Sequence, residues 1–282
     1  MTSYAHPEVL VDTQWVADHL RDPTVRIIEV HLDPASTHPP PYETGHIPGA
    51  VLWNSMTTLL QPDFRLNTDK TTVEGLLSRS GVANDMTVVL YSDHPAGAPW
   101  ALWYLQLFGH RAVRVLNGGR QKWLADGRPL TAEVPVVTST VYKVKDPDLT
   151  LRALRDEVQA AVGKGTPVLL DVRRPQEYSG EWYMMGPPAE GQRTGHIPGA
   201  VPLYYEAALN ADGTFKAAQE LAGIYGSQGV TPDKPAITYC AVGIRSAHTW
   251  FVLTHLLGYP HVKSYDGSWN DWANATDTPI EK

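Results

Sequence analysis

One seven-residue segment occurs twice in this chain, and it constrains the fold more than any other feature of the sequence. Residues Gly45–Val51 read Gly-His-Ile-Pro-Gly-Ala-Val, and the same seven residues return 150 positions later as Gly195–Val201. Shorter matches follow in the same order, such as Trp123 with Trp272. Matches that keep their order over half a chain indicate an internal duplication. The sequence therefore predicts one domain fold, present twice.

The length of the chain fits this duplication. A chain of 282 residues is long enough for two domains, each with its own core. Between the two copies, residues 126–148 are polar, contain three prolines and show no helical period. We interpret residues 1–125 as the first domain, 126–148 as a linker and 149–282 as the second domain.

Apolar strands alternate with helical segments in both copies. This pattern predicts an α/β fold, in which a parallel sheet is covered by helices on both faces. The predicted strands are Val25–Val30, Ala50–Trp53, Met86–Tyr91 and Val113–Leu116, then Val168–Val172, Ala200–Leu203, Ala236–Tyr239 and Val262–Tyr265. The predicted helices are a short one capped by Asp12, Val73–Ser78, Trp100–Phe108, Leu151–Val162 and one beginning at Ser246, which is expected to cap it.

Composition excludes several classes of function. The net charge is −7 and no cluster of Lys and Arg occurs, which argues against nucleic acid as a partner. No apolar run is long enough to cross a membrane, and the first residues lack the pattern of a signal peptide. The single cysteine excludes an internal disulfide, so we expect a reducing compartment, the cytoplasm. No metal site or cofactor is predicted, because His94, His248, His255 and His261 lack partners at metal-binding spacing.

The single cysteine, Cys240, stands at a junction that favours reactivity. An apolar strand precedes it and an amphipathic segment, Ala247–Leu257, follows it, so it lies in a tight loop between strand and helix. Backbone N–H groups and a helix N-terminus both stabilise a thiolate over a thiol. The alternative role of a lone cysteine is that of a small buried apolar residue.

The two copies serve as controls for each other. His46 and His196 occur in both, as do the acids Glu29 and Asp171, so we expect all four to support the fold. The copies differ at the Cys240 loop, where the first has Ser92–Gly97 and lacks both the thiol and an arginine. Chemistry is therefore predicted in the second domain, with the first inactive.

These features together resemble a two-domain rhodanese, a thiosulfate sulfurtransferase. The resemblance rests on Gly-His-Ile-Pro-Gly-Ala in each half, Asp171-Val172-Arg173 in the second, and a Cys-x-x-Gly-x-Arg loop near the C-terminus, and it covers nearly the whole chain. It implies a five-stranded parallel sheet with helices on both faces in each domain and an inactive N-terminal half. It also implies a monomer whose active cysteine carries a persulfide.

The resemblance assigns roles to particular residues. Cys240 would attack the outer sulfur of thiosulfate and pass that sulfur to cyanide or a thiol. The backbone N–H groups around the sulfur would come from the loop residues Ala241, Val242, Gly243, Ile244 and Arg245. Arg245 would either bind the donor or form a salt bridge that orients the loop. Arg173 aligns with His31 of the first copy and is expected to bind an anion.

Some residues depart from the family pattern and leave alternatives open. Many relatives that use thiosulfate carry a basic side chain where this chain has Ala241 and Val242, and an arginine where it has Glu177. A 3-mercaptopyruvate sulfurtransferase is the first alternative, although its usual Cys-Gly-[Ser/Ala]-Gly-[Val] loop differs. Residues 178–193 are longer than in the first copy. They either pack on their own domain or border the active site.

Two further functions belong to other classes. A cysteine phosphatase also uses a Cys-loop-Arg element before a helix. That class needs Cys-x5-Arg, whereas the interval from Cys240 to Arg245 is Cys-x4-Arg. A non-catalytic sulfur carrier or interaction module is the other possibility, and the presence of Cys240 and Arg245 argues against a purely inert one.

Overall fold

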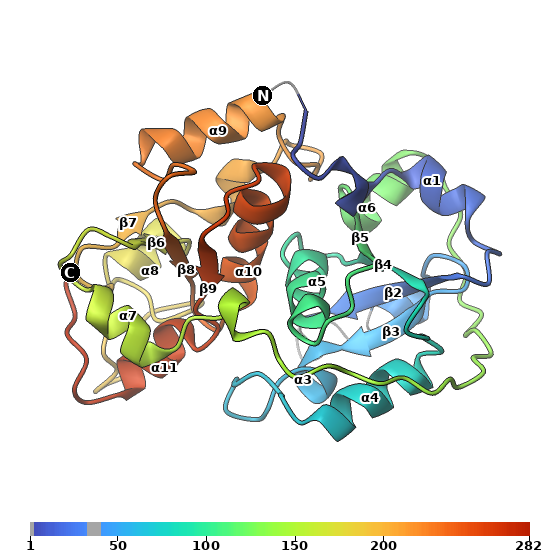
Figure 1. The fold of residues 1–282 in the computed structure, drawn as a ribbon, viewed down its shortest axis with the longest axis horizontal. Coiled ribbons are helices and arrows are strands. Elements are labelled where there is room, and N and C mark those ends of the chain that lie inside the picture. The colour runs from blue at the N-terminus through green and yellow to red at the C-terminus, as the bar shows by residue number, and fades with distance from the viewer. Residues whose placement is uncertain (1–2, 33–40) are drawn as a thin grey trace. The chain divides into compact units, whose positions relative to one another are not determined.

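The computed structural model describes residues 3–32 and 41–282, which form two compact units (Figure 1). The N-terminal unit consists of Glu8–Asp148 together with Asn210–Phe215. The C-terminal unit consists of Leu149–Leu209, Lys216–Lys282 and the residues up to Pro7.

The N-terminal unit contains a five-stranded parallel sheet in the order β1-β5-β4-β2-β3. Its strands are β1 (Leu10–Val11), β2 (Val25–His31), β3 (Val51–Asn54), β4 (Thr87–Tyr91) and β5 (Val113–Leu116). The four predicted strands are found to within a residue or two. The two-residue β1 was not predicted, because two residues carry no periodic signal.

Helices cover both faces of this sheet. They are α1 (Thr13–Asp18), α2 (Pro41–Thr44), α3 (Ser55–Thr58), α4 (Lys70–Arg79), α5 (Gly97–Leu107) and α6 (Gly119–Ala125), and a 3-10 turn, η1 (Pro7–Val9), precedes β1. Side chains of α1 and α6 share a buried cluster with β2 and β4, whereas α5 lies outside that cluster and packs on β2, β4 and β5. The predicted cap of α1 is confirmed, because the Asp12 carboxylate accepts the Trp15 N–H at 2.7 Å.

The segment after α6 stays on the N-terminal unit. The Thr140 N–H donates to Ser78 O at 3.0 Å, and the Lys145 N–H donates to Phe108 O at 3.1 Å. Residues 126–148 therefore contain little regular structure but are held by backbone hydrogen bonds.

The C-terminal unit contains a four-stranded parallel sheet in the order β7-β6-β8-β9. Its strands are β6 (Val168–Asp171), β7 (Val201–Pro202), β8 (Ala236–Tyr239) and β9 (Val262–Ser264). The expected fifth strand is reduced to a single parallel bridge between Arg152 and Ser264. The edge strand β7 is shorter than predicted, although the Leu203 N–H still donates to Asp171 O at 2.8 Å. Pro202 fits here because an edge strand tolerates a residue without an N–H.

The helices of this unit also cover both faces of its sheet. They are α7 (Arg155–Ala161), α8 (Pro175–Tyr178), α9 (Ala218–Ser227), α10 (Ile244–Phe251) and α11 (Ser268–Asn274), with 3-10 turns η2 (Leu149–Leu151) and η3 (Tyr205–Ala208) and a π-helical turn η4 (Val252–Leu256). Side chains of α7 and α11 form a buried cluster on one face, while α10 packs on β8 and β9. Helix α7 begins later than predicted, because η2 takes up the start of the segment. Helices α8, α9 and α11 were not predicted.

The repeated segment joins strand ends to the neighbouring loops. In the C-terminal unit, the Tyr239 hydroxyl accepts the Ile197 N–H at 3.2 Å, and His196 Nδ1 lies 3.0 Å from Tyr178 O. The corresponding residues Tyr91, Ile47, His46 and Tyr42 make the same two contacts in the N-terminal unit at 3.0 and 2.8 Å. Both histidines also stack on their tyrosines. The duplicated residues therefore make structural contacts in both copies.

Candidate active site

The candidate site lies at the carboxyl ends of β6 and β8. The two strands are hydrogen-bonded neighbours, and Asp171 is paired with Tyr239 at their ends. Cys240 therefore follows β8 directly beside the residues that follow β6. Ligands of parallel α/β sheets bind at this edge, beyond the carboxyl ends of the strands.

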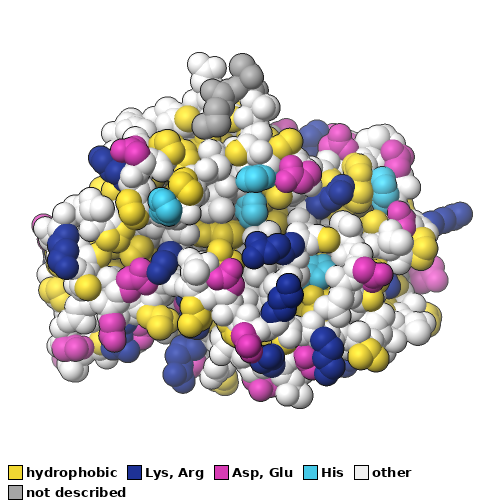
Figure 2. Space-filling model, in the orientation of Figure 1, with side chains coloured by type: hydrophobic (Ala, Val, Ile, Leu, Met, Phe, Trp, Pro, Cys, Tyr) yellow, Lys and Arg dark blue, Asp and Glu magenta, His cyan; other side chains and the backbone are white. Residues whose placement is uncertain are grey.

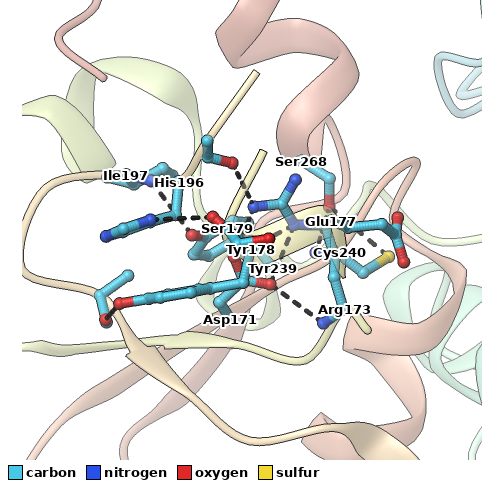
Figure 3. A network of polar contacts seen from close by, with 12 residues as sticks. Asp171, Arg173, Glu177, Tyr178, Ser179, His196, Ile197, Tyr239, Cys240 and Ser268 are labelled. Carbon is cyan, nitrogen blue, oxygen red and sulfur yellow. Dashed lines mark hydrogen bonds and ion pairs between the residues drawn. The ribbon is translucent and has the colours of Figure 1, made fainter. Parts of the chain in front are cut away.

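The Cys240 sulfur is buried and accepts a hydrogen bond from its own loop. Its Sγ accepts the backbone N–H of Gly243 at 3.2 Å, and the residue is buried, with 0% exposure. Ser268 lies beside Cys240 (Figure 3), and the Cys240 N–H donates to Ser268 Oγ at 3.0 Å. The Ser268 hydroxyl in turn donates to Tyr265 O at 2.7 Å. Because the Ser268 proton is directed to Tyr265, its contact with Sγ at 3.9 Å is weak. The Gly243 N–H is thus the direct donor to the sulfur.

Helix α11 holds the loop in place. The Trp269 N–H donates to Cys240 O, and the Asn270 N–H donates to Ala241 O, both at 2.9 Å. These N–H groups belong to the first turn of α11, where a helix leaves donors without internal partners. The carbonyl groups of the loop are therefore turned toward α11.

Gly243 is the residue that the loop geometry demands. Its φ is +92°, and it forms the N-cap of α10. A Cβ at this position would lie 2.5 Å from Asp266 O, a backbone atom that cannot move away on its own. Ser246, predicted as the cap, instead lies in the first turn and donates to Gly243 O at 2.8 Å. The helix thus begins two residues earlier than predicted, because Gly243 adopts the left-handed conformation that starts it.

Arg245 forms a buried salt bridge. Its two terminal nitrogens donate to the two oxygens of Glu177 at 2.6 and 2.8 Å, with side-chain exposures of 16% for Arg245 and 0% for Glu177. Glu177 also accepts the Arg174 N–H at 3.1 Å. Burial by itself lowers the pKa of Arg245, but its hydrogen bonds to Glu177 and the charge of Cys240 raise it above its ordinary value. The guanidinium therefore stays charged beside the sulfur.

Arg173 lies in a closed network and not at an open anion site. Its guanidinium donates to both oxygens of Asp171, with the shortest contact at 2.6 Å, and to Gly195 O at 2.7 Å (Figure 3). It also lies over the rings of Tyr239 and Trp269, at 5.6 and 4.5 Å from their centroids. The side chain is 1% exposed. Its charge is used to hold the start of the repeated segment.

The N-terminal unit builds the same network from a different position. Arg120, in α6, donates to both oxygens of Glu29 at 3.1 Å and also to Gly45 O. His31, which aligns with Arg173 in sequence, does not take this role. In the alignment of the two copies, Arg120 corresponds to Trp269. The alignment alone therefore does not reveal that Arg120 takes the role of Arg173.

The loop after β4 has none of the chemistry of its counterpart. Ser92 Oγ donates to Val30 O at 2.6 Å, and it accepts the His94 N–H at 3.2 Å. Asp93 is 3.3 Å from Arg120. The side chains of this loop are thus committed to local contacts.

Two residues of the site were not predicted from the sequence. Ser268 has a φ of +51°, which is unusual for a residue with a Cβ, and strain of this kind clusters at functional sites. The first copy has Gly119 at this position, with a φ of +56°. This difference between the two copies, Ser268 against Gly119, is the sequence signal that could have identified Ser268 as a residue of the site. The other residue is Arg174, which is exposed at the end of β6; it adjoins Arg173 and had no distinguishing pattern.

The segment 178–193 packs partly on its own unit. The Trp182 N–H donates to Gln176 O at 2.9 Å, and Tyr183 packs against the buried cluster of α7 and α11. Met185, in contrast, is 85% exposed. The segment thus has an anchored start and an exposed turn.

Across residues 3–32 and 41–282, no group of three or more His, Cys, Asp or Glu side chains is placed to hold a metal ion. No helix within those ranges is long and apolar enough to cross a membrane. Basic and acidic side chains are interspersed on the face shown in Figure 2.

Comparison with known families decides the relationship. The rhodanese-like domain family matches residues 12–126 and again residues 154–275. The chain belongs to the rhodanese family. The two matches place the predicted Cys240 loop inside the second rhodanese-like domain.

Several rhodanese relatives match over nearly the whole chain. "Sulfur carrier protein TtuD" of Thermus thermophilus is 48% identical over 99% of this chain and 98% of its own length. A "Putative thiosulfate sulfurtransferase" of Mycolicibacterium smegmatis is 45% identical over 98% of this chain and 99% of its own. Among solved structures, a persulfide form of EanB with ergothioneine has a TM-score of 0.87 and 26% identity, covering 99% of this chain and 71% of that one.

Proposed function

We propose that this rhodanese is a sulfurtransferase that moves sulfane sulfur from thiosulfate to cyanide or a thiol through a persulfide on Cys240. The observation that carries the proposal is the position of the sulfur. Cys240 Sγ accepts the Gly243 N–H at the N-terminus of α10, beside the charged Arg245. The charge of a buried thiolate has to be offset by donors and cations, and this loop supplies both.

The proposed reaction has two displacements. In the first, the Cys240 thiolate attacks the outer sulfur of thiosulfate, and a bond forms between Sγ and that sulfur. The S–S bond of the donor breaks, and sulfite leaves with the electron pair. The product is a persulfide anion, held by the same groups of the loop as the thiolate. In the second, cyanide or a thiolate attacks the terminal sulfur, and the Cys240 thiolate returns. No oxidant or reductant is consumed.

The residues of the loop divide this work. The Gly243 N–H faces the sulfur, and the Arg245 charge stabilises the negative form of Cys240 in both its free and persulfide states. Glu177 holds Arg245 in place through two hydrogen bonds. In this proposal Arg173 is a structural residue. The N-terminal unit, whose loop carries Ser92 and no thiol, has no catalytic part.

A protein acceptor is a second candidate for the sulfur. The 48% identical relative is named a sulfur carrier protein. A carrier needs the same persulfide on Cys240 but passes the sulfur to another protein. The two functions therefore share the first displacement and differ in the second.

Intact-mass spectrometry tests the first displacement. Incubation with thiosulfate is expected to add one sulfur, about 32 Da, to the wild-type protein. The adduct is expected to be absent from Cys240→Ser and to disappear on addition of cyanide, with thiocyanate as the product. Absence of the adduct with thiosulfate, with 3-mercaptopyruvate and with inorganic polysulfide would refute the sulfurtransferase proposal.

Steady-state kinetics then resolve the donor and the acceptor. Thiosulfate is expected to load Cys240 at a higher kcat/KM than 3-mercaptopyruvate does, because a dianion gains more from a cationic edge than a monoanion. The reverse order would assign the chain to the 3-mercaptopyruvate group. A loaded protein that discharges to a protein thiol but not to cyanide would favour the carrier function.

A further inference from the structure

Three arginines occupy the edge where β6 and β8 end, and they differ in how their charge is used. Arg173 is paired with Asp171, and Arg245 is paired with Glu177, each through a carboxylate that is 0% exposed. The third, Arg174, is exposed and forms no ion pair with any carboxylate in the described part of the chain. Unlike the other two, its guanidinium has no carboxylate in direct contact among the described residues, and the Glu177 charge acts on it only from a distance.

The neighbours of Arg174 hold it without neutralising it. Its guanidinium lies 5.9 Å from the centre of the Trp182 ring. The Tyr204 hydroxyl donates to Glu206 at 2.6 Å, so its oxygen is left to accept from Arg174. This hydrogen bond to Tyr204 is the main cause that raises the pKa of Arg174, with a smaller contribution from the Glu177 charge, whereas burial and the Arg245 charge oppose the rise.

The side chain is therefore fixed at the site by neutral groups. Glu206 is occupied by two tyrosine hydroxyls, since Tyr205 also donates to it, at 2.9 Å. Arg174 and Arg245 are joined through Glu177, whose Oε2 accepts the Arg174 backbone N–H at 3.1 Å and the Arg245 guanidinium at 2.6 Å. Of these two cations, only the Arg245 guanidinium has a carboxylate partner among the described residues. The other, Arg174, is suited to bind an anion that arrives from solvent.

We propose that Arg174 binds the oxyanion end of the sulfur donor while Cys240 attacks its outer sulfur. This inference rests on the proposed function. It assigns to Arg174 the task expected of Arg173 from the sequence, and it explains how an anionic donor is attracted when Ala241 and Val242 carry no charge. In a protein of net charge −7, attraction of an anion has to be local, and in this proposal Arg174 supplies it.

The test measures persulfide formation on Cys240 as a function of thiosulfate concentration in Arg174→Gln. Loss of a charge-assisted hydrogen bond is expected to raise the half-saturating concentration by about 10-fold or more. The limiting rate is expected to stay within about 3-fold of wild type, because the groups at the sulfur are unchanged. The dependence of loading on salt is expected to flatten. Arg174→Lys, which keeps the charge, is expected to restore most of the affinity.

Two controls separate binding from structure and from net charge. Lys234→Gln removes the same charge from an exposed side chain that precedes β8, at the opposite edge of the sheet; we expect it to load like wild type. Discharge of preloaded Arg174→Gln to 2-mercaptoethanol, a neutral thiol, is also expected to match wild type, because no donor is bound in that step.

The outcomes distinguish this inference from the proposed function. If wild type loads but Arg174→Gln has an unchanged half-saturating concentration and salt dependence, the role of Arg174 is wrong and the sulfurtransferase proposal stands. A fall in the limiting rate alone, or an equal effect of Lys234→Gln, would also overturn it. If wild type itself does not load with any donor, the proposed function fails first.

Discussion

Replacement of Gly243 by alanine tests the loop geometry most directly. The new Cβ would lie 2.5 Å from Asp266 O and 2.9 Å from Asp266 Cα, both backbone atoms. The φ of +92° adds a second cost, because a residue with a Cβ rarely adopts it. The left-handed conformation costs about 1–2 kcal/mol, and overpacking of this kind costs about 1–3 kcal/mol. We expect a total loss of about 2–5 kcal/mol in the free energy of unfolding.

Urea denaturation measures the stability part of this prediction. Because the chain forms two units, the curve is fitted with two transitions if two are resolved, and only one of them is expected to shift in Gly243→Ala. The matched control is Gly223→Ala in α9, where an added Cβ meets nothing within 4 Å. That substitution is expected to stabilise the protein by about 0.5–1 kcal/mol.

Persulfide formation measures the chemical part. A shifted Gly243 N–H no longer faces the Cys240 sulfur, so loading by thiosulfate is expected to slow by at least about 10-fold in the folded variant. Gly243→Asn separates the two costs, because asparagine tolerates positive φ but keeps the clash of the Cβ. A Gly243→Ala protein with wild-type stability and a wild-type loading rate would refute the account of the loop.

Other predictions concern the structural networks of the two units. Arg173→Met leaves Asp171 buried without its partner, and we expect a loss of about 3–5 kcal/mol in the free energy of unfolding, measured in urea; a variant of normal stability with weakened thiosulfate binding would instead make Arg173 an anion-binding residue. Burial raises the pKa of Glu29 to about 7, although Tyr91 and Arg120 oppose the rise, so the native state keeps a proton that the unfolded chain loses. Stability is therefore expected to fall as the pH rises from about 4.5 to 7 and to level off above 7. Glu29→Gln is expected to flatten that slope, and an unchanged slope in the variant would contradict this origin.

Local sequence signals were sufficient wherever a short segment fixes its own conformation. The Asp12 cap is confirmed because a cap needs only its own first turn. The strand β8 was predicted at its observed bounds, since a buried parallel strand is apolar throughout. The start of α10 was misplaced because the left-handed Gly243 is as good a helix start as the nearby Ser246, and only the packing of Asp266 against the loop selects it.

The side-chain partners of the arginines depended on tertiary structure. Arg173 was expected at an anion site because its counterpart in the first copy is His31, yet it is buried against Asp171. The N-terminal unit fills the same place with Arg120 from another element. A guanidinium has a long side chain, so two positions far apart in the sequence can put it at the same point in space. Alignment of the two copies compares positions along the chain and not points in space.

The sequence by itself determined that one fold occurs twice, that it is a rhodanese-like α/β fold, and that Cys240 lies in a loop between strand and helix. The duplication and the strand-loop-helix order follow from repeated residues and from hydrophobic period, which neighbouring positions along the chain express directly. The rhodanese-like assignment rests instead on the resemblance of the repeated segment, Asp171-Val172-Arg173 and the Cys240 loop to that family. Only the tertiary structure decided which charges remain available beside that cysteine. Whether a charge is neutralised depends on carboxylates such as Glu177, which lies 68 residues from Arg245 in the chain. Among the three described arginines at this edge of the sheet, such pairing leaves Arg174 as the exposed one.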